Sequence, residues 1–201
     1  MRSVKILLIA ATTSFACGAM SSALAMMSAT EGWYLEANVG STKLSNQGYP
    51  ALASSSSSGI GGNLNLGYKF MPYAAAELGY TQYANTTIKD QFGNKAAKDR
   101  HYSYDIAVKG ILPIADSGFE PFAKLGVARL NSKITISNET AANNINLQSS
   151  NRNTNNLYMA VGAQYYFMPE MAMNVQWARA RGNRTTGTLD LISAGVSFIF
   201  D

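Results

Sequence analysis

The residue types that could carry out hydrolysis occur together at one place in the chain. His101 is the only histidine, and Ser103 and Asp105 follow it at alternating positions. Nucleophilic hydrolysis needs a serine, a histidine and an oriented acid, and alternate residues of a strand share one face. Such alternation is also common in ordinary strands. We therefore expect His101 to lie at a loop–strand junction and Asp105 to pack inside the lumen of the barrel that the strand pattern predicts below. We expect no catalytic residue.

The sequence contains few residues that could bind a metal or a cofactor. Zinc sites are built largely from cysteine and histidine, and the chain holds one of each, Cys17 and His101. The glycine-rich stretch at 59–62 is not expected to bind phosphate, because no helix is expected to follow it. We expect neither a metal site nor a cofactor.

Charged residues recur inside segments that otherwise alternate apolar residues with small or neutral polar ones. In "LNLGYKFMPYAAAELGY" (64–80), Lys69 and Glu77 occupy alternate positions that otherwise hold glycine, alanine and asparagine, which we call the polar parity. Tyr68 and Leu78 occupy the other set of alternate positions, the apolar parity. Alternation with a period of two indicates β-strands. Seven charges fall on the polar parity of such segments: Glu36, Lys69, Glu77, Asp105, Lys109, Glu120 and Lys124.

Eight alternating segments predict the elements that position these charges. The predicted strands are Trp33–Ser41, Ile60–Phe70, Tyr73–Tyr83, Tyr102–Leu112, Phe119–Leu130, Asn156–Phe167, Met171–Arg179 and Leu189–Phe200. The connections alternate between short turns and long polar loops, as in an up-and-down meander. The serine run at 54–58 and the Asn/Ser-rich stretch at 143–156 indicate mobile, solvated chain. We expect an all-β, eight-stranded antiparallel up-and-down barrel.

The composition of the two strand faces indicates which one is outside. A soluble lipocalin-like barrel would expose the polar parity, which should then be rich in Lys and Glu, but seven charges over eight strands are too few. The apolar parity carries aromatic residues near both strand ends, as membrane barrels do. They are Trp33, Tyr68, Phe70, Tyr165, Phe167, Phe198 and Phe200 at the short-turn end, and Tyr80, Tyr104 and Trp177 at the other. We expect a transmembrane barrel with its charges in the lumen.

The first residues indicate export across a membrane. Arg2 and Lys5 precede an apolar run that is too short to span a bilayer, and Ala23-Leu24-Ala25 fits a signal-peptidase site. Lipidation at Cys17 is not expected, because the residues before it are of the wrong type. We predict a signal peptide over 1–25 and a barrel domain over 26–201. The formal charge of +4, of which Arg2 and Lys5 contribute two, is too low to indicate a nucleic-acid-binding protein.

Several segments resemble the OmpA-type eight-stranded outer-membrane barrels. They are "GYKFMPYAAAELGY", "VKGILPI", "FAKLGVA", "AVGAQYYFMPEMAMNVQWA" and "LISAGVSFIF". The resemblance implies an integral protein of the bacterial outer membrane, in contact with membrane lipid, lipopolysaccharide and the outer-membrane assembly machinery. It implies a C-terminal assembly signal at Phe198 and Phe200. It also implies a stand-alone barrel without the periplasmic peptidoglycan-binding domain of longer members.

The resemblance further implies a structural charge network in the lumen. Glu77, Lys109 and Lys124 match inward charges of the family, whereas Gln164 and Asn174 stand where family members can hold an acid and an arginine. We therefore expect Glu77 to pair with Lys109 or Lys124, with Gln164 as a neutral donor. A salt-bridge switch that regulates conductance is not expected.

The long connections carry a modest basic excess. Lys89, Lys95, Lys98 and Arg100 lie in the second, against Asp90 and Asp99, and Arg179, Arg181 and Arg184 flank the fourth. These cations could contact lipopolysaccharide phosphates or an anionic host surface or matrix, or could simply be solvated. The sequence favours a structural or surface-interaction role, in envelope integrity, adhesion or host contact. The alternatives are a lipid A-modifying enzyme and a narrow low-conductance pore.

Overall fold

The computed structural model describes residues 31–45, 54–55, 58–90, 92–114, 117–184 and 186–200. The predicted signal peptide and its cleavage site lie outside the described residues. None of the described helices is long and apolar enough to cross a membrane.

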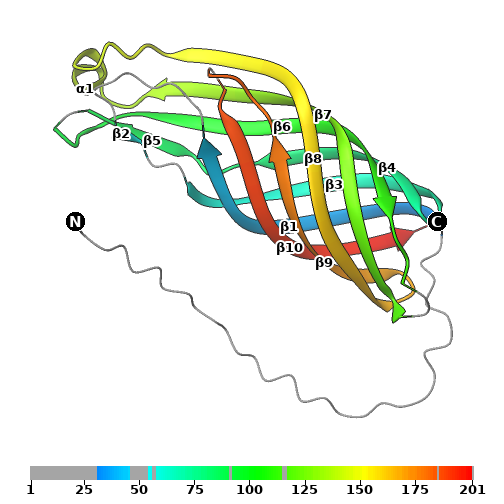
Figure 1. Cartoon of the computed structure of the whole chain (residues 1–201). Helices are drawn as coiled ribbons and strands as arrows, with labels where there is room; N and C mark the ends of the chain where they lie inside the picture. The colour runs from blue at the N-terminus through cyan, green and yellow to red at the C-terminus, as the bar shows by residue number, and fades with distance from the viewer. Residues whose placement is uncertain are drawn as a thin grey trace, which may run out of the picture.

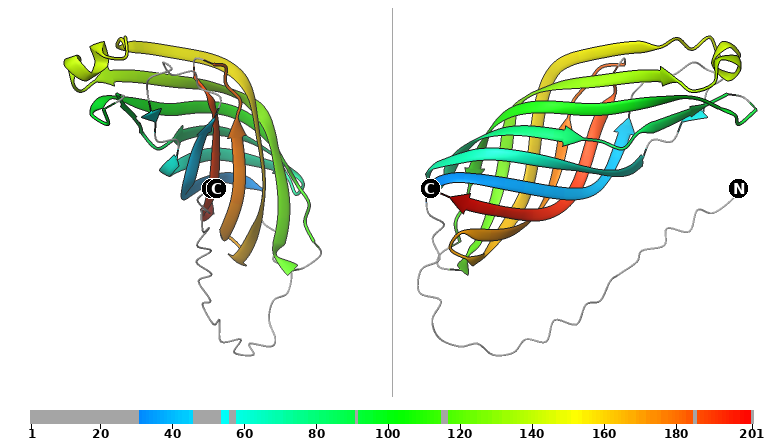
Figure 2. Two further views of the ribbon diagram at one scale, coloured as in Figure 1. Left: turned by 60° about the vertical axis from the view of Figure 1, so that its left-hand side comes forward. Right: turned by 180° about the vertical axis from the view of Figure 1, so that it is seen from behind.

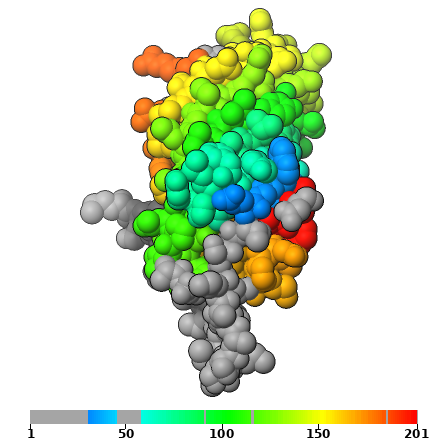
Figure 3. Space-filling view, turned by 90° about the vertical axis from the view of Figure 1, so that its right-hand side faces the viewer, coloured from blue at the N-terminus to red at the C-terminus, as the bar shows by residue number. Residues whose placement is uncertain are grey.

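Eight long antiparallel strands form a closed barrel, which confirms the predicted fold (Figure 1). They are β1 (Gly32–Ser45), β3 (Ser58–Met71), β4 (Ala74–Gln82), β6 (Lys95–Ile111), β7 (Phe119–Ile136), β8 (Ser150–Met168), β9 (Met171–Ala180) and β10 (Thr188–Phe200). The first and last strands pair, with Trp33 opposite Phe200, and β6 pairs with β7. In the space-filling view of Figure 3, residues of β1 (blue) accordingly lie against residues of β10 (red). Closure leaves no free strand edge, so the backbone can cross hydrocarbon with its amides paired.

Burial alternates along the strands with the period that the sequence predicts. In β4, Ala75, Glu77 and Gly79 face the lumen, while Leu78 and Tyr80 are exposed on the outer surface. Exposed apolar side chains therefore cover the outside of the barrel. A protein in water rarely shows so large an apolar surface, whereas lipid requires one.

Aromatic side chains cluster near both ends of this apolar surface. At the short-turn end, the rings of Trp33 and Tyr68 lie 5.2 Å apart between centroids. At the opposite end, where the long connections lie, the ring of Tyr104 lies 5.3 Å from Tyr80 and 5.9 Å from Tyr102. Two aromatic groups separated by aliphatic side chains match the girdles of a bilayer-spanning barrel.

The long-loop end is more ordered than the sequence predicted. Strands β6, β7 and β8 begin or end several residues beyond the predicted limits, and β2 (Ser54–Ser55), β5 (Thr86–Lys89) and helix α1 (Glu139–Asn143) lie beside them. Figures 1 and 2 show β6, β7 and β8 extending past the remaining long strands, with α1 beyond the ends of β7 and β8. We call β5, α1 and residues 95–101, 131–136 and 144–149 the outer platform.

A small apolar core holds the outer platform together. It consists of Ile88, Ala96, Ala97, Ile134, Ala141, Ala142, Ile145 and Leu147, all buried. The expectation of mobile, solvated chain over 143–156 is therefore corrected, because a few apolar residues from distant segments share one core. Of the serine run, residues 56–57 lie outside the described residues.

Candidate functional site

Glu36 on β1 lies at the centre of a charge network in the lumen. Its Oε1 atom lies 3.1 Å from Lys124 Nζ, and its Oε2 atom lies 3.3 Å from Lys109 Nζ. Asn38 and Asn65 each donate a hydrogen bond of 2.9 Å to Oε1. The sequence placed Glu36 on the luminal parity but not in the network. Only the register of β1 against its neighbours sets its height in the barrel, and the sequence does not supply that register.

Glu77 on β4 completes the network. Its Oε2 atom lies 2.7 Å from Lys124 Nζ and its Oε1 atom 3.5 Å from Lys109 Nζ, so each lysine contacts both carboxylates. The hydroxyl of Tyr34 donates a 2.5 Å hydrogen bond to Glu77. Two carboxylates and two ammonium groups balance in charge, which a buried cluster requires.

Gln164 on β8 connects this network to a second ion pair. Lys109 donates to its Oε1 atom at 2.9 Å, and its Nε2 atom donates to Glu120 at 2.6 Å. Glu120 in turn lies 3.3 Å from Lys69. Asn174 lies opposite Gln164 in the β8–β9 register, but its side-chain amide has no hydrogen-bond partner among the described residues. The structure thus brings Glu77, Lys109, Lys124 and Gln164 together and leaves Asn174 beside them.

Aromatic rings also surround the luminal lysines. Lys109 Nζ lies 4.3 Å from the ring centroid of Phe122 and 5.2 Å from that of Tyr34, and Lys124 Nζ lies 5.3 Å from Phe122. An ammonium group over an aromatic face is attracted by the ring quadrupole. The network is therefore enclosed by protein atoms on several sides.

Apolar side chains fill the lumen on either side of the network. Toward the long-loop end lie Leu44, Tyr83, Leu130, Tyr158, Leu189 and Leu191, and toward the short turns lie Ile111, Tyr166 and Ile199. A void beside Lys69, Lys109 and Gln164 measures about 10 Å³, about the minimum that one water molecule needs. Buried apolar side chains thus lie on both sides of the charge network.

The structure places His101 inside β6 and not at a loop–strand junction, which corrects that expectation. Its side chain is fully buried, with Nε2 3.4 Å from Asp99 Oδ2. Its ring nitrogens make no hydrogen bond to any described residue. The hydroxyl of Ser103 instead lies 3.3 Å from that of Tyr83. His101, Ser103 and Asp105 share a face, but no serine hydroxyl among the described residues is hydrogen-bonded to His101; Ser132, opposite it in the β6–β7 register, donates to Asp99 at 2.8 Å. The described residues include no cluster of metal-binding side chains.

The acidic and basic side chains of the second long connection differ in their exposure to solvent. Asp90 and Asp99 are buried, whereas Lys89, Lys95, Lys98 and Arg100 are exposed. Asp90 holds the β5–β6 turn by accepting hydrogen bonds from the backbone amides of Phe92 at 2.9 Å and Asn94 at 2.8 Å. Desolvation raises the pKa of Asp90, but the hydrogen bonds from Asn94 and its neighbours outweigh it and lower the pKa below its ordinary value.

Comparisons with known proteins agree with this architecture. A family described as "Outer membrane protein beta-barrel domain" matches residues 9–200. Outer membrane protein P5 of Haemophilus influenzae is 26% identical over 103 residues, which is 51% of this chain and 29% of P5. The chain thus spans less than a third of the length of that relative.

Solved structures with the same fold include three bacterial barrels of low sequence identity. Neisserial surface protein A gives a TM-score of 0.58 at 18% identity, covering 84% of this chain and 97% of its own. OprG of Pseudomonas aeruginosa gives 0.56 at 15% identity, covering 88% and 100%. Ail of Yersinia pestis, described in complex with the heparin analogue sucrose octasulfate, gives 0.53 at 14% identity, covering 85% and 100%.

Proposed function

The chain belongs to the outer membrane protein beta-barrel domain family, and on that premise we propose that it is a non-enzymatic anchor that presents an ordered platform for surface contact. Its place is the bacterial outer membrane. The observation that carries the proposal is the apolar core of the outer platform, where Ile88 is 0% and Ile134 is 2% exposed. A barrel that needed only to span the bilayer would gain nothing from ordering its outer connections, because loop order costs conformational entropy.

The filled lumen supports an anchor over a pore. Conduction needs an open path, and here buried apolar side chains such as Leu130, Tyr158 and Leu191 occupy the lumen beyond the charge network, beside buried polar ones. The surroundings of His101 likewise favour a non-enzymatic role, because no serine hydroxyl is hydrogen-bonded to it among the described residues. The proposed contact is therefore made by the outer surface and not through the lumen.

The charge of the platform suggests the kind of surface that it contacts. Lys89, Lys95 and Lys98 are exposed, and the nearby Asp90 and Asp99 are buried. Ail is described with a sulfated ligand, and a sulfated glycan on a host cell has the charge that suits these lysines. We propose adhesion to such glycans as the role of the platform.

Adhesion of bacteria that produce the chain to heparin-coated surfaces tests this proposal. Ile88→Asn with Ile134→Asn should open the platform core and lower adhesion several-fold, and Lys89→Gln, Lys95→Gln and Lys98→Gln together should do the same. Thr87→Asn with Thr135→Asn is the matched control, because these residues lie on the same strands outside the core. Equal adhesion by all variants, with each barrel folded, would refute the platform proposal.

A further inference from the structure

Neutral polar side chains lie next to the charge network in the lumen. They are Asn38 on β1, Asn63 on β3, Asn174 and Gln176 on β9, and Ser193 on β10, none more than 7% exposed; we call them the amide cluster. Asn38 donates a hydrogen bond of 2.9 Å to Glu36 of the network. Gln176 Nε2 lies 3.5 Å from Asn63 Oδ1, although β10 and β1 separate their strands. The cluster therefore extends across the inside of the barrel from β9 to β3.

Every member of the amide cluster carries a side-chain polar atom with no hydrogen-bond partner among the described residues. These atoms are Asn38 Oδ1, Asn63 Nδ2, Gln176 Oε1, Ser193 Oγ and both ends of the Asn174 amide. The carboxylate of Glu36 can only accept hydrogen bonds, so it holds the nitrogen of Asn38 and leaves the oxygen free. Polar atoms that are buried without a partner are costly. The amide cluster thus offers several oxygens to a ligand.

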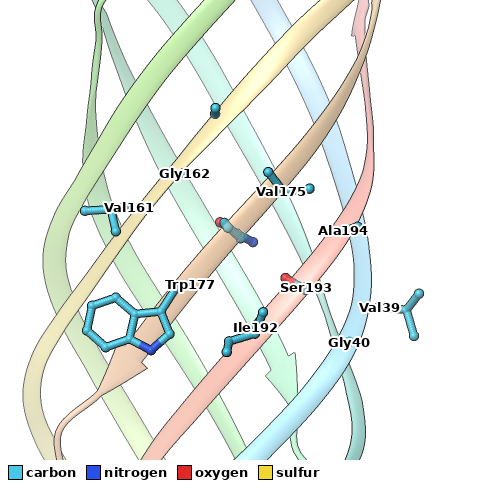
Figure 4. Close-up of a pocket in the computed structure, with 11 residues that line it drawn as sticks. Val39, Gly40, Val161, Gly162, Val175, Trp177, Ile192, Ser193 and Ala194 are labelled. Atoms are coloured by element: carbon cyan, nitrogen blue, oxygen red, sulfur yellow. The ribbon is translucent and has the colours of Figure 1, made fainter. Parts of the chain in front are cut away.

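Glycines stand opposite most of these side chains in the strand registers. The pairs are Asn38–Gly195, Asn174–Gly195, Ser193–Gly40 and Gln176–Gly162. Figure 4 shows this wall of the barrel, with Gly40, Gly162 and Ser193 among its residues. A side chain at position 195 would collide with Asn38 Oδ1. The paired strands therefore contribute no side chain at these positions that could take up the free polar atoms.

The buried charges of the lumen do not balance. Below the outer platform, the described residues include four buried acids and three buried lysines, namely Glu36, Glu77, Asp105, Glu120, Lys69, Lys109 and Lys124. Asp105 is the acid that forms no ion pair with a described residue, and no described residue donates a hydrogen bond to its Oδ2 atom. With all seven groups ionised, the lumen carries one excess negative charge, which burial opposes.

The excess charge lies close to the amide cluster. The carboxylate of Asp105 lies against Gly79, where a side chain would collide with it. Gly79 is opposite Asp105 on one side and Asn65 on the other, and Asn65 is two residues from Asn63 on the same face of β3. Asp105 thus belongs to the row of luminal residues next to the cluster.

We infer that the amide cluster binds one monovalent alkali cation, Na⁺ or K⁺, through the oxygens of Asn38, Gln176 and Ser193, with the charge balanced by Asp105. Hard cations take oxygen ligands, including amide carbonyls. A single positive charge matches the single excess negative charge, whereas a divalent ion would exceed it. A proton on Asp105 would balance the charge without satisfying the three oxygens, and water would satisfy the oxygens without balancing the charge. The inference does not rest on adhesion by the outer platform.

The dependence of stability on the cation tests the site. The chain, folded in phosphatidylcholine vesicles, would be unfolded by urea at mildly alkaline pH in potassium, sodium or choline chloride of equal ionic strength. The alkali ion that binds should favour the folded state by roughly tenfold over choline when its concentration is about ten times the Kd, because only the folded chain forms the site. Ser193→Ala and Asp105→Asn should each remove most of this difference.

Ser197→Ala is the matched control, because Ser197 is a buried residue of the same strand outside the amide cluster, and it should keep the full difference. Equal stability of the unaltered chain in the three salts would overturn the inference. So would an equal loss of the cation dependence in Ser193→Ala and Ser197→Ala, or its full retention in Ser193→Ala. Cold-SDS gel mobility verifies that each variant is folded, and Ser193→Ala carries the test if Asp105→Asn does not fold.

Crystals of the chain grown in rubidium chloride locate the ion independently. Rubidium replaces potassium or sodium and gives an anomalous diffraction signal. We expect a peak within the amide cluster, in contact with oxygens of Asn38, Gln176 and Ser193. Ordered water alone at this position, with no anomalous peak, would overturn the assignment.

Discussion

Lys124 on β7 and Glu77 on β4 meet inside the lumen, with Nζ and Oε2 2.7 Å apart. Their strands are not neighbours, because β6 lies between them. The contact therefore depends on the registers of two strand pairs, β4–β6 and β6–β7. Breaking such a buried pair leaves a charge with no adequate partner, which costs about 3–5 kcal/mol.

Glu36 should contribute more to stability than any other luminal acid. Glu36→Gln would leave Lys109 and Lys124 sharing a single carboxylate, and we expect it to lower the free energy of unfolding by about 3–5 kcal/mol. Glu170→Gln, at an exposed turn position, should change it by less than about 0.5 kcal/mol. Urea unfolding in lipid vesicles measures both. Equal effects would mean that the Glu36 contacts do not stabilise the barrel.

The sequence predicted the number of long strands and which side chains of most strands face the lumen, because alternation is local. It did not place Glu36 in the network, since the height of a luminal side chain depends on register between strands that are far apart in sequence. It also did not predict the outer platform. Ile88, Ile134 and Leu147 each stand between two polar residues in the sequence, and only the fold brings them into one core.

The packed lumen predicts that the folded chain does not conduct ions at a steady level. In planar bilayers, the purified chain should give no stable channel steps, because apolar side chains occupy the lumen on both sides of the charge network. The comparison is a variant with Leu130→Ser and Leu191→Ser, in which the apolar cluster of the lumen toward the long-loop end becomes polar. Regular conductance steps from the unaltered chain would support the alternative of a narrow pore.

His101 should carry no chemistry. His101→Ala is expected to leave lipid A composition unchanged in the producing cells, because no described hydroxyl is hydrogen-bonded to its ring. Mass spectrometry of extracted lipid A measures the acyl groups. A lost or gained acyl chain that depends on His101 would restore the enzyme alternative.

The mature protein should begin at Met26, because Ala23-Leu24-Ala25 fits the small-residue rule for cleavage. Mass spectrometry of the N-terminal peptide from purified outer membranes identifies the start. A lipid on Cys17 or an intact leader in the membrane-inserted protein would contradict the proposed boundary between 1–25 and 26–201.

A double-mutant cycle between Glu77 and Lys124 tests most directly whether the luminal charges hold the barrel together. Lys124→Met alone should lower the free energy of unfolding in lipid vesicles by a few kcal/mol, and Glu77→Gln in the same background should recover part of that loss, since it removes the stranded carboxylate. We predict a coupling free energy of about 1–3 kcal/mol between the two positions. Additive effects, with a coupling indistinguishable from zero, would contradict the pairing and with it the account of a sealed, charge-stabilised lumen.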